Sequence, residues 1–436
     1  MKIPEILQVE TSQTAASLAS VLKVIADAGL LLEHVTMVHR EQGRTLWEIT
    51  FEVAESEREA LLASLSTLPS ARFVGWSDRA LERHRGGKIE VRSRVAISSQ
   101  QILRDIYGPG VARVCLAIEK DPDKALEYTY VGRAVAVVTD GSAVRSAGQV
   151  GTRARLPVME GRAALLASLV GLSGVPILVD STAVDHFVEV VRDIAPSFGA
   201  ILLADLSAPR CFEIERKLRA QLEIPVLHDD QHGTAVVALA ALLNATRTAD
   251  VSLAHSDVGL IGLGSAGLGI ARLLRSFGIN RLFGTDVRPE AMGRLAELRG
   301  QGASVEQVMA RSGIVIATTG TKGLIRPELV RQRQIILALS GPEPEIESVT
   351  ALEAGAAIAV DGRSINSVLA FPGLFAGALR SRATDFTDAM LIAAAQALAG
   401  TASDGQLVPD ALNPDVHEVV AAAVAAAVRT DMRDEP

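Results

Sequence analysis

The sequence predicts an α/β protein in which a small βαββαβ domain precedes two domains built from parallel strands and helices. Residues 1–86 contain short alternating strands and two amphipathic helices. From about residue 97, buried apolar strands alternate with helices, and this alternation restarts near Ser252. Such alternation is typical of a parallel sheet with helices on its faces. We therefore expect domains at residues 1–86, 87–248 and 249–436.

The composition excludes several classes of protein. A hydrophobic content of 48% over 436 residues allows a large core, and 3% aromatic residues mean that Ala, Val, Leu and Ile build it. The net charge of −8 argues against a general nucleic-acid binder. Cys115 and Cys211 are too few for a disulfide framework or a thiolate cluster. No leader or membrane span is evident, so we expect no membrane partner and a cytoplasmic location.

The N-terminal pattern predicts one small antiparallel sheet. Its elements are a strand at Ile6–Thr11, a helix at Thr14–Gly29, a hairpin at Leu31–Val53, a helix at Glu55–Leu68 and a strand at Ala71–Asp78. This order resembles the ACT family of regulatory domains, which would bind a small effector. The alternative is an ordinary ferredoxin-like dimerisation module, since one fold hosts many roles. The charged segment Arg79–Lys88 is predicted to be a linker.

The stretch His228–Thr234 (HDDQHGT) lies between a short buried strand, Ile224–Leu227, and a strong helix former, Ala235–Leu243. In α/β proteins ligand sites gather at the carboxyl ends of strands, where this turn would lie. We expect its two histidines to fill hydrogen-bonding roles, because imidazole suits softer metal ions than carboxylates do.

A dinucleotide fingerprint follows the strand after Ser252. It contains Gly262, Gly264, Ser265, Ala266 and Gly267. The glycines let the backbone approach a pyrophosphate at a helix N-terminus, and Asp286 at the end of the next strand would receive the ribose hydroxyls. This pattern predicts a Rossmann-type domain and favours NAD over NADP, although Arg288 keeps NADP open. We also assign Thr234 to the cofactor contacts.

Several motifs resemble those of the bacterial malic enzymes, from about Ile97 to Ala399. They are YGPGVARVCL, VAVVTDGSAV, LPVMEGRAAL, APRCFEIERKL, HDDQHGTAVVALAALLNA, GLGSAG, LSGPEPEI and SVLAFPGLFAGAL. The resemblance implies oxidation of L-malate with a nicotinamide cofactor, decarboxylation of the resulting oxaloacetate, and a homodimer. It also implies that Tyr107 is the catalytic acid, that the position of Arg162 belongs to the base, and that Asp205 and Asp230, with Asp229 beside them, are ligands for Mg²⁺ or Mn²⁺.

The sequence departs from the family pattern within this site. Arg162 replaces the family's lysine, and a guanidinium stays protonated and is a poor base. Ala204 replaces a glutamate ligand, which leaves a weakened metal site. Among the substrate contacts, Gly341 replaces an asparagine and the pair Asn366–Ser367 replaces two asparagines. The Gly-rich loop is altered at Arg145–Gly151, and Glu343 and Glu345, in a Pro-broken segment, are expected to be solvated.

These departures leave three interpretations. The one we favour is an NAD-dependent, malic-enzyme-like oxidoreductase for malate or a related 2-hydroxy acid, with weakened or altered activity. The second is a catalytically silent paralogue that binds NAD or an effector and regulates a partner. The third is ordinary malic enzyme activity, but removing a general base typically costs roughly 10²–10⁴-fold in rate.

Overall fold

The computed structural model describes residues 2–14, 16–77, 79–143, 151–341, 344–362 and 365–431. The chain divides into two compact units, Met1–Glu90 and Val91–Pro436. Each unit is described by itself below. The domain boundaries that the sequence places at residues 86 and 248 stay predictions.

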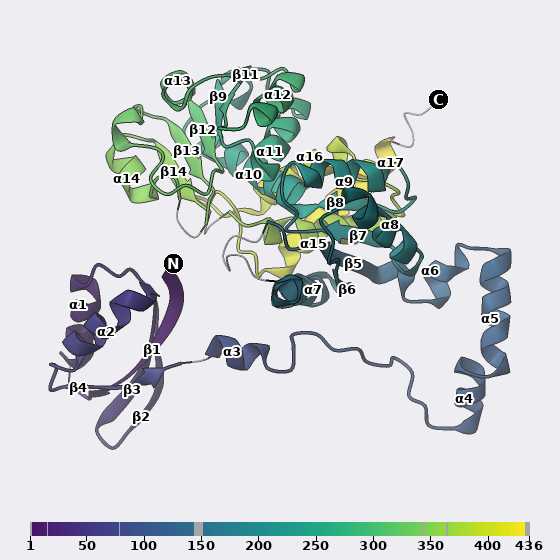
Figure 1. Ribbon diagram of the computed structural model, residues 1–436, viewed down its shortest axis with the longest axis horizontal. Helices are drawn as coiled ribbons and strands as arrows, with labels where there is room; N and C mark the ends of the chain where they lie inside the picture. Colours follow the sequence, from purple (N-terminus) through teal and green to yellow (C-terminus); the bar gives the residue numbers. More distant parts are fainter. Residues whose placement is uncertain are drawn as a thin grey trace. The chain divides into compact units, whose positions relative to one another are not determined.

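The N-terminal unit has the predicted βαββαβ order (Figure 1). Its elements are β1 (Lys2–Ser12), α1 (Ser17–Asp27), β2 (Leu32–Glu41), β3 (Arg44–Ala54), α2 (Glu55–Leu65) and β4 (Ala71–Trp76). The strands form one antiparallel sheet in the order β2-β3-β1-β4. Gln42 and Gly43 turn the hairpin with φ values of 45° and 77°, as a tight turn of this kind requires. Buried Leu7, Ile25 and Phe51 join the helices to the sheet.

Helix α3 (Arg79–His84) lies within the predicted linker Arg79–Lys88, where the sequence indicated no regular structure. The run Ala80–Arg83 consists of strong helix formers, and their intrinsic propensity outweighs the charge that indicated a linker. Gly86 and Gly87 follow with φ values of 83°, a conformation that ends regular structure.

The second unit begins with a helical segment that contains no buried residue. Its helices are α4 (Gln100–Ile106), α5 (Pro109–Lys120) and α6 (Lys124–Tyr128). The Ser99 hydroxyl caps α4 by accepting from the Ile102 N–H at 3.2 Å, and Pro109 opens α5. Leu116 is 70% exposed and Tyr107 is 84% exposed. Exposed apolar side chains gathered on one segment are typical of an interaction surface.

A four-stranded parallel sheet follows, in the order β6-β5-β7-β8. Its elements are β5 (Ala134–Thr139), α7 (Leu156–Val170), β6 (Ser173–Leu178), α8 (Val184–Ile194), β7 (Ala200–Leu203), α9 (Arg210–Arg219), β8 (Val226–His228) and α10 (Asp229–Thr248). Alternate residues of β5 enter two different core clusters, with Val135 and Val137 in one and Ala136 and Val138 in the other. The sheet is therefore covered on both faces, as its unbroken apolar strands predict.

A second parallel sheet has six strands in the order β11-β10-β9-β12-β13-β14. Its elements are β9 (Val258–Ile261), α11 (Ser265–Ser276), β10 (Leu282–Thr285), α12 (Pro289–Glu297), β11 (Gln301–Gly302), α13 (Val305–Arg311), β12 (Ile314–Ala317), β13 (Ile335–Ala338), α14 (Ser348–Glu353) and β14 (Ile358–Asp361). The strand order reverses between β9 and β12, and dinucleotides bind at such a switch point. The predicted Rossmann-type doubly wound sheet is confirmed.

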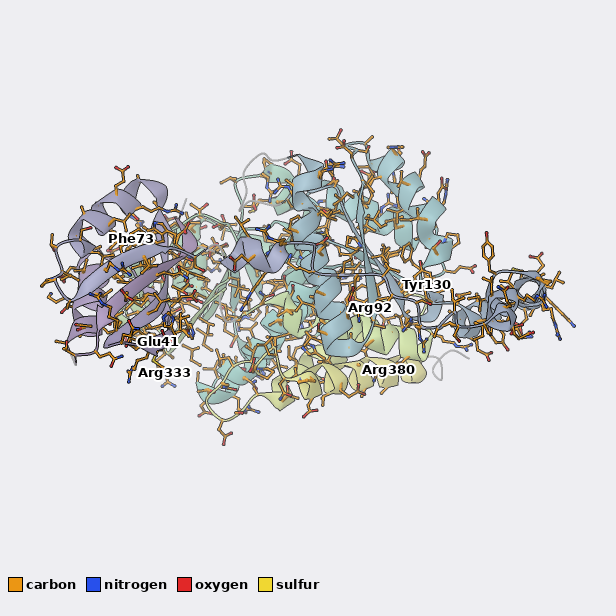
Figure 2. The ribbon with its side chains drawn as sticks, turned by 90° about the horizontal axis from the view of Figure 1, so that it is seen from below. Glu41, Phe73, Arg92, Tyr130, Arg333 and Arg380 are labelled. Atoms are coloured by element: carbon orange, nitrogen blue, oxygen red, sulfur yellow. The ribbon has the colours of Figure 1, made fainter. Side chains whose placement is uncertain are left out.

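Three helices close the chain: α15 (Phe371–Ser381), α16 (Asp388–Thr401) and α17 (Pro414–Asp431). Arg380 of α15, labelled in Figure 2, pairs with Glu418 of α17 through two contacts of 2.5 and 2.6 Å. Within the described ranges, no helix combines the length and the apolar character needed to cross a bilayer.

Helices α10 and α11 connect the two parallel sheets. α10 follows β8 of the first sheet and packs against α11, which follows β9 of the second (Figure 1). The two helices approach closely at Gly269 of α11, where a Cβ would lie 2.4 Å from the backbone oxygen of Gln231 in α10. Only glycine fits at position 269 without moving one of the helices.

Candidate active site at the start of helix α10

Two carboxylates open α10 directly after β8. Asp229 is fully buried, and Asp230 accepts the backbone N–H of Asp205 at 2.8 Å. Asp205 follows β7, the strand beside β8, and its φ of 53° turns the chain sharply there. The N-terminus of a helix favours negative charge, which suits Asp229 and Asp230. The ends of two neighbouring strands thus bring three predicted residues into one carboxylate cluster, Asp205, Asp229 and Asp230.

The guanidinium of Arg162, from α7, lies among these carboxylates. Its Nη1 contacts Asp229 Oδ2, and its Nη2 lies 3.4 Å from Asp230 Oδ1 and 3.9 Å from Asp205 Oδ1. The Ser367 hydroxyl donates to Asp229 Oδ2 at 2.8 Å, and the Phe371 ring centre lies 5.9 Å from Arg162 Cζ. Arg162 and Ser367, both predicted from the sequence, therefore belong to the same site as the three aspartates.

The electrostatics of the cluster follow from its crowding. Burial and the negative charge of Asp230 raise the pKa of Asp205 to about 6. Burial alone would also raise the pKa of Asp230, but a hydrogen bond and the charge of His228, together with Arg162, lower it to about 2. Burial opposes the charge of Arg162, and the surrounding carboxylates still raise its pKa above the ordinary value. Arg162 therefore stays protonated.

These side chains, as arranged, do not fit a resident divalent metal. Among the described residues, no group of three His, Cys, Asp or Glu side chains is placed to hold one. The guanidinium lies between the carboxylates that would act as ligands, and buried Ala204 offers no oxygen. Mg²⁺ requires oxygen ligands in near-octahedral geometry. The weakened Mg²⁺ or Mn²⁺ site expected from the sequence stays a prediction.

Sequence reasoning missed Glu215, whose carboxylate accepts hydrogen bonds from the turn between β8 and α10. This residue is 5% exposed and accepts from the His228 N–H at 2.9 Å and from Gln231 Nε2 at 3.0 Å. His232 Nε2 lies 3.0 Å from Glu215 Oε1. His228 Nδ1 lies 3.0 Å from Gln231 Nε2, so both imidazoles have the hydrogen-bonding roles expected from the sequence. Helical spacing could have identified Glu215, because it places this residue on the same buried face of α9 as Cys211 and Leu218.

Four other predicted residues do not join the cluster. Tyr107 ends α4, in the segment without buried residues. Asn366 is exposed, and its Oδ1 accepts from the Val368 N–H at 3.0 Å, so it caps a short helical turn. Gly341 is exposed after β13, and Thr234 is partly exposed on α10. Residues 145–150 of the Gly-rich loop and Glu343 lie outside the described residues.

The dinucleotide fingerprint has the expected geometry. Gly262 has a φ of 94°, and a Cβ on Gly267 would lie 2.0 Å from the Gly262 oxygen, so both positions require glycine. A Cβ on Gly264 would meet no atom closer than Arg288 Nη2 at 3.8 Å, which leaves the turn open to a ligand. Helix α11 begins at Ser265 and Ala266 beside this opening, a ready site for a pyrophosphate.

Asp286 lies at the position predicted for ribose recognition. Its Oδ2 accepts from the Leu263 N–H at 2.7 Å, and Arg288 Nε donates to Oδ1 at 3.0 Å. The ion pair with Arg288 and these hydrogen bonds outweigh partial burial and lower the pKa of Asp286. The carboxylate is therefore ionised at the edge of the cofactor crevice.

The expectation that Glu345 is solvated is wrong. Glu345 is fully buried, and its Oε1 accepts from the hydroxyls of Thr319 at 2.8 Å and Ser340 at 2.6 Å. These partners follow β12 and β13, so Glu345 joins two loops at the cofactor end of the sheet. A proline-broken segment indicates an irregular backbone but not its burial.

Two family profiles match the chain. One, described as "Malic enzyme, N-terminal domain", matches residues 86–219. The other, "Malic enzyme, NAD binding domain", matches residues 231–291 and 358–432. Together they cover most of the second unit, and they leave out residues 220–230, which include β8, and residues 292–357.

Relatives match over much longer spans. NAD-dependent malic enzyme 1 of Bacillus subtilis is 46% identical over 430 residues, 98% of each chain. The NAD-dependent malic enzyme of Geobacillus stearothermophilus is 36% identical over 97% of this chain and 94% of its own. The crystal structure of malic enzyme from Pyrococcus horikoshii is 36% identical, with a TM-score of 0.77 over 81% of this chain and 91% of its own. The chain therefore belongs to the malic enzyme family.

Proposed function

We propose that the chain is an NAD-dependent oxidoreductase that oxidises and decarboxylates malate or a related 2-hydroxy acid. The observation that supports this most is the 46% identity to an NAD-dependent malic enzyme over nearly the whole chain. The open turn at Gly264 and the ionised Asp286 agree with NAD as the cofactor. We propose a turnover below that of a site with lysine and glutamate, because Arg162 and Ala204 stand at those positions.

In this proposal each group has a defined task. NAD supplies the hydride acceptor when bound, and the N-terminus of α11 with Asp286 binds its pyrophosphate and ribose. Arg162 holds a carboxylate or the C2 oxygen of the substrate with its N–H groups, beside Asp205 and Asp230. Because a protonated guanidinium cannot accept a proton, proton transfer falls to Tyr107 or to a water molecule.

Purified chain is expected to reduce NAD slowly with L-malate or a close analogue and to release the decarboxylated product. A screen of 2-hydroxy acids, with and without Mg²⁺ or Mn²⁺, followed by NADH absorbance and product analysis, tests this. Binding of NAD with no turnover of any acid would instead favour the silent NAD-binding paralogue. The cofactor control is Asp286→Ala, which should weaken NAD binding in calorimetry. Unchanged affinity in that variant would contradict the role given to Asp286.

We propose an ACT-like regulatory role for the N-terminal unit. Its strand order, β2-β3-β1-β4, supports the resemblance to ACT domains. The alignment with the Bacillus subtilis relative covers 98% of this chain and so includes most of this unit. A small effector would bind this unit. A cytoplasmic location stays an expectation from the sequence.

We also propose a homodimer in which Tyr107 reaches the carboxylate cluster of the partner copy. Tyr107 is 84% exposed, and the segment α4–α6 that carries it buries no residue within one chain. A second copy of this chain would cover the apolar side chains of that segment. Light scattering that shows a monomer would contradict the dimer.

A mixing experiment tests the origin of Tyr107. Tyr107→Phe is expected to lose most activity, since removing a general acid costs roughly 10²–10⁴-fold. Asp230→Asn is also expected to lose most activity, because it removes a carboxylate that holds Arg162. After co-refolding, heterodimers would contain one site with both native residues, and activity should return to about one quarter of the native value for random pairing in a C₂ dimer. If each chain used its own Tyr107, no activity would return.

A further inference from the structure

The carboxylate cluster already contains a cation of its own. We propose that Arg162 replaces a divalent metal at Asp205, Asp229 and Asp230, so that the chain does not take up Mg²⁺ or Mn²⁺ at this site. The catalytic part of this inference rests on the proposed function, but the exclusion of the metal does not.

The geometry of Arg162 supports this exclusion. The two Nη atoms lie near all three carboxylates, with Nη1 at Asp229 and Nη2 near Asp230 and Asp205. The planar fork of a guanidinium is suited to such multiple contacts, which a lysine ammonium would make only as a point charge. Phe371 lies near the guanidinium, so the side chain is held by packing as well as by charge. A metal at the centre of the cluster would meet both the volume and the positive charge of Arg162.

Ala204, which stands where the family has a glutamate, also disfavours a bound metal. Ala204 is fully buried beside Asp205, so a glutamate there would add a fourth carboxylate to the cluster. A single guanidinium would balance four carboxylates less well than three, and a buried charge without a partner is strongly unfavourable. The alanine therefore removes a metal ligand and also lowers the negative charge that Arg162 must balance.

Asp229 is also poorly placed to hold an ion. Its Oδ2 is used by Arg162 and by Ser367. Its Oδ1 is buried without a hydrogen-bond partner among the described residues and is enclosed beside Gly233, where a Cβ would lie 2.0 Å from it. One oxygen of this carboxylate is therefore occupied by protein groups, and the other has little room for an ion beside Gly233.

Two buried atoms of the cluster have the chemistry that a substrate hydroxyl needs. Arg162 Nε and Asp205 Oδ2 are buried and have no hydrogen-bond partner among the described residues. One is a donor and the other an acceptor, and a hydroxyl group can accept from the first and donate to the second. The C2 hydroxyl of a 2-hydroxy acid has this chemistry. Arg162 would thus provide the positive charge at the C2 oxygen that a metal provides elsewhere.

Mn²⁺ binding to the full-length chain tests the inference directly. The free Mn²⁺ signal in electron paramagnetic resonance is expected to stay unchanged with the native chain. The double variant Arg162→Lys with Ala204→Glu is expected to bind about one equivalent, because it opens the centre and restores an oxygen ligand. Adding Asp230→Asn to this double variant should abolish the binding. Arg219→Lys is the matched control, since Arg219 pairs with Asp385 outside the cluster, and it should behave like the native chain.

Binding of about one equivalent of Mn²⁺ by the native chain, lost on Asp230→Asn, would overturn the inference. Thermal unfolding gives a second measurement that needs no engineered metal site. A ligand that binds the native state raises Tm, so Mn²⁺ or a chelator should leave the Tm of the native chain unchanged. A Tm that falls with the chelator and returns with Mn²⁺ would contradict it.

These measurements need no turnover, so they separate this inference from the proposed function. A native chain that excludes Mn²⁺ and turns over no 2-hydroxy acid would refute the function and leave the metal inference standing. A native chain that turns over malate only with bound Mn²⁺ would refute the metal inference alone.

Discussion

The double substitution Arg162→Lys with Ala204→Glu is expected to raise malate turnover by roughly 10²–10⁴-fold, the range that a positioned general base contributes. A lysine in this site can lose its proton, because burial lowers the pKa of an ammonium, whereas the guanidinium cannot lose its own. The glutamate adds an oxygen ligand beside Asp205. Steady-state kinetics with NAD, L-malate and Mn²⁺ measure the effect.

Each single variant serves as a control for the double substitution. Arg162→Lys alone supplies the base without the ligand, and Ala204→Glu alone adds a fourth carboxylate around Arg162. Both should fall short of the double variant, since residues that act as a unit are not additive. Turnover of the double variant no higher than native would contradict the view that Arg162 and Ala204 together limit the reaction.

Glu215→Ala is expected to destabilise the second unit by about 3–5 kcal/mol, because buried donors left without an acceptor cost roughly 1–3 kcal/mol each. The substitution leaves His232, Gln231 and the His228 N–H without their common acceptor. For a unit of this size the fall in Tm would be on the order of 10 °C. Thermal unfolding followed by circular dichroism measures it.

Glu215→Gln is the matched control, because it keeps the shape and one acceptor but loses the charge. Burial opposes that charge, yet His232 and His228 lower the pKa of Glu215 to about 2 from an ordinary value of 4.5. A lowered carboxyl pKa stabilises the folded state above about 4.5, and this contribution is lost as the pH falls toward 2. The stability difference between native chain and Glu215→Gln should therefore shrink over that interval. A difference independent of pH would contradict the ion pair.

The architecture could be predicted because it depends on local patterns. Alternating strands and helices, the hairpin around Gln42–Gly43 and the glycine turn at Gly262 are each encoded within a short stretch. The helix at Arg79–His84 was missed because charge and helix propensity indicate different structures for the same residues. The burial of Glu345 depends on two distant loops, so its own segment gives no sign of it.

The site could be predicted only as a set of residues. The motifs identified Arg162, the three aspartates and Ser367, and these residues meet in the structure. The position of the guanidinium among the carboxylates could not be predicted, because it depends on how α7 packs beside the start of α10. The exposure of Tyr107 also lies beyond sequence patterns, since helix α4 is amphipathic whether its partner is the same chain or another.

The contact between Gly269 and Gln231 has a consequence for hydride transfer. Gln231 directly follows Asp230, and Gly269 lies one turn inside the helix that begins at the dinucleotide turn. With backbone against backbone, α10 and α11 cannot move closer to each other. With NAD bound, main-chain atoms rather than flexible side chains would therefore limit how closely the carboxylates and the cofactor turn approach. Hydride transfer requires reacting atoms within about 3–3.5 Å of each other. A methyl group at position 269 would push α10 and α11 apart, and it would do so without contacting the cofactor or the substrate.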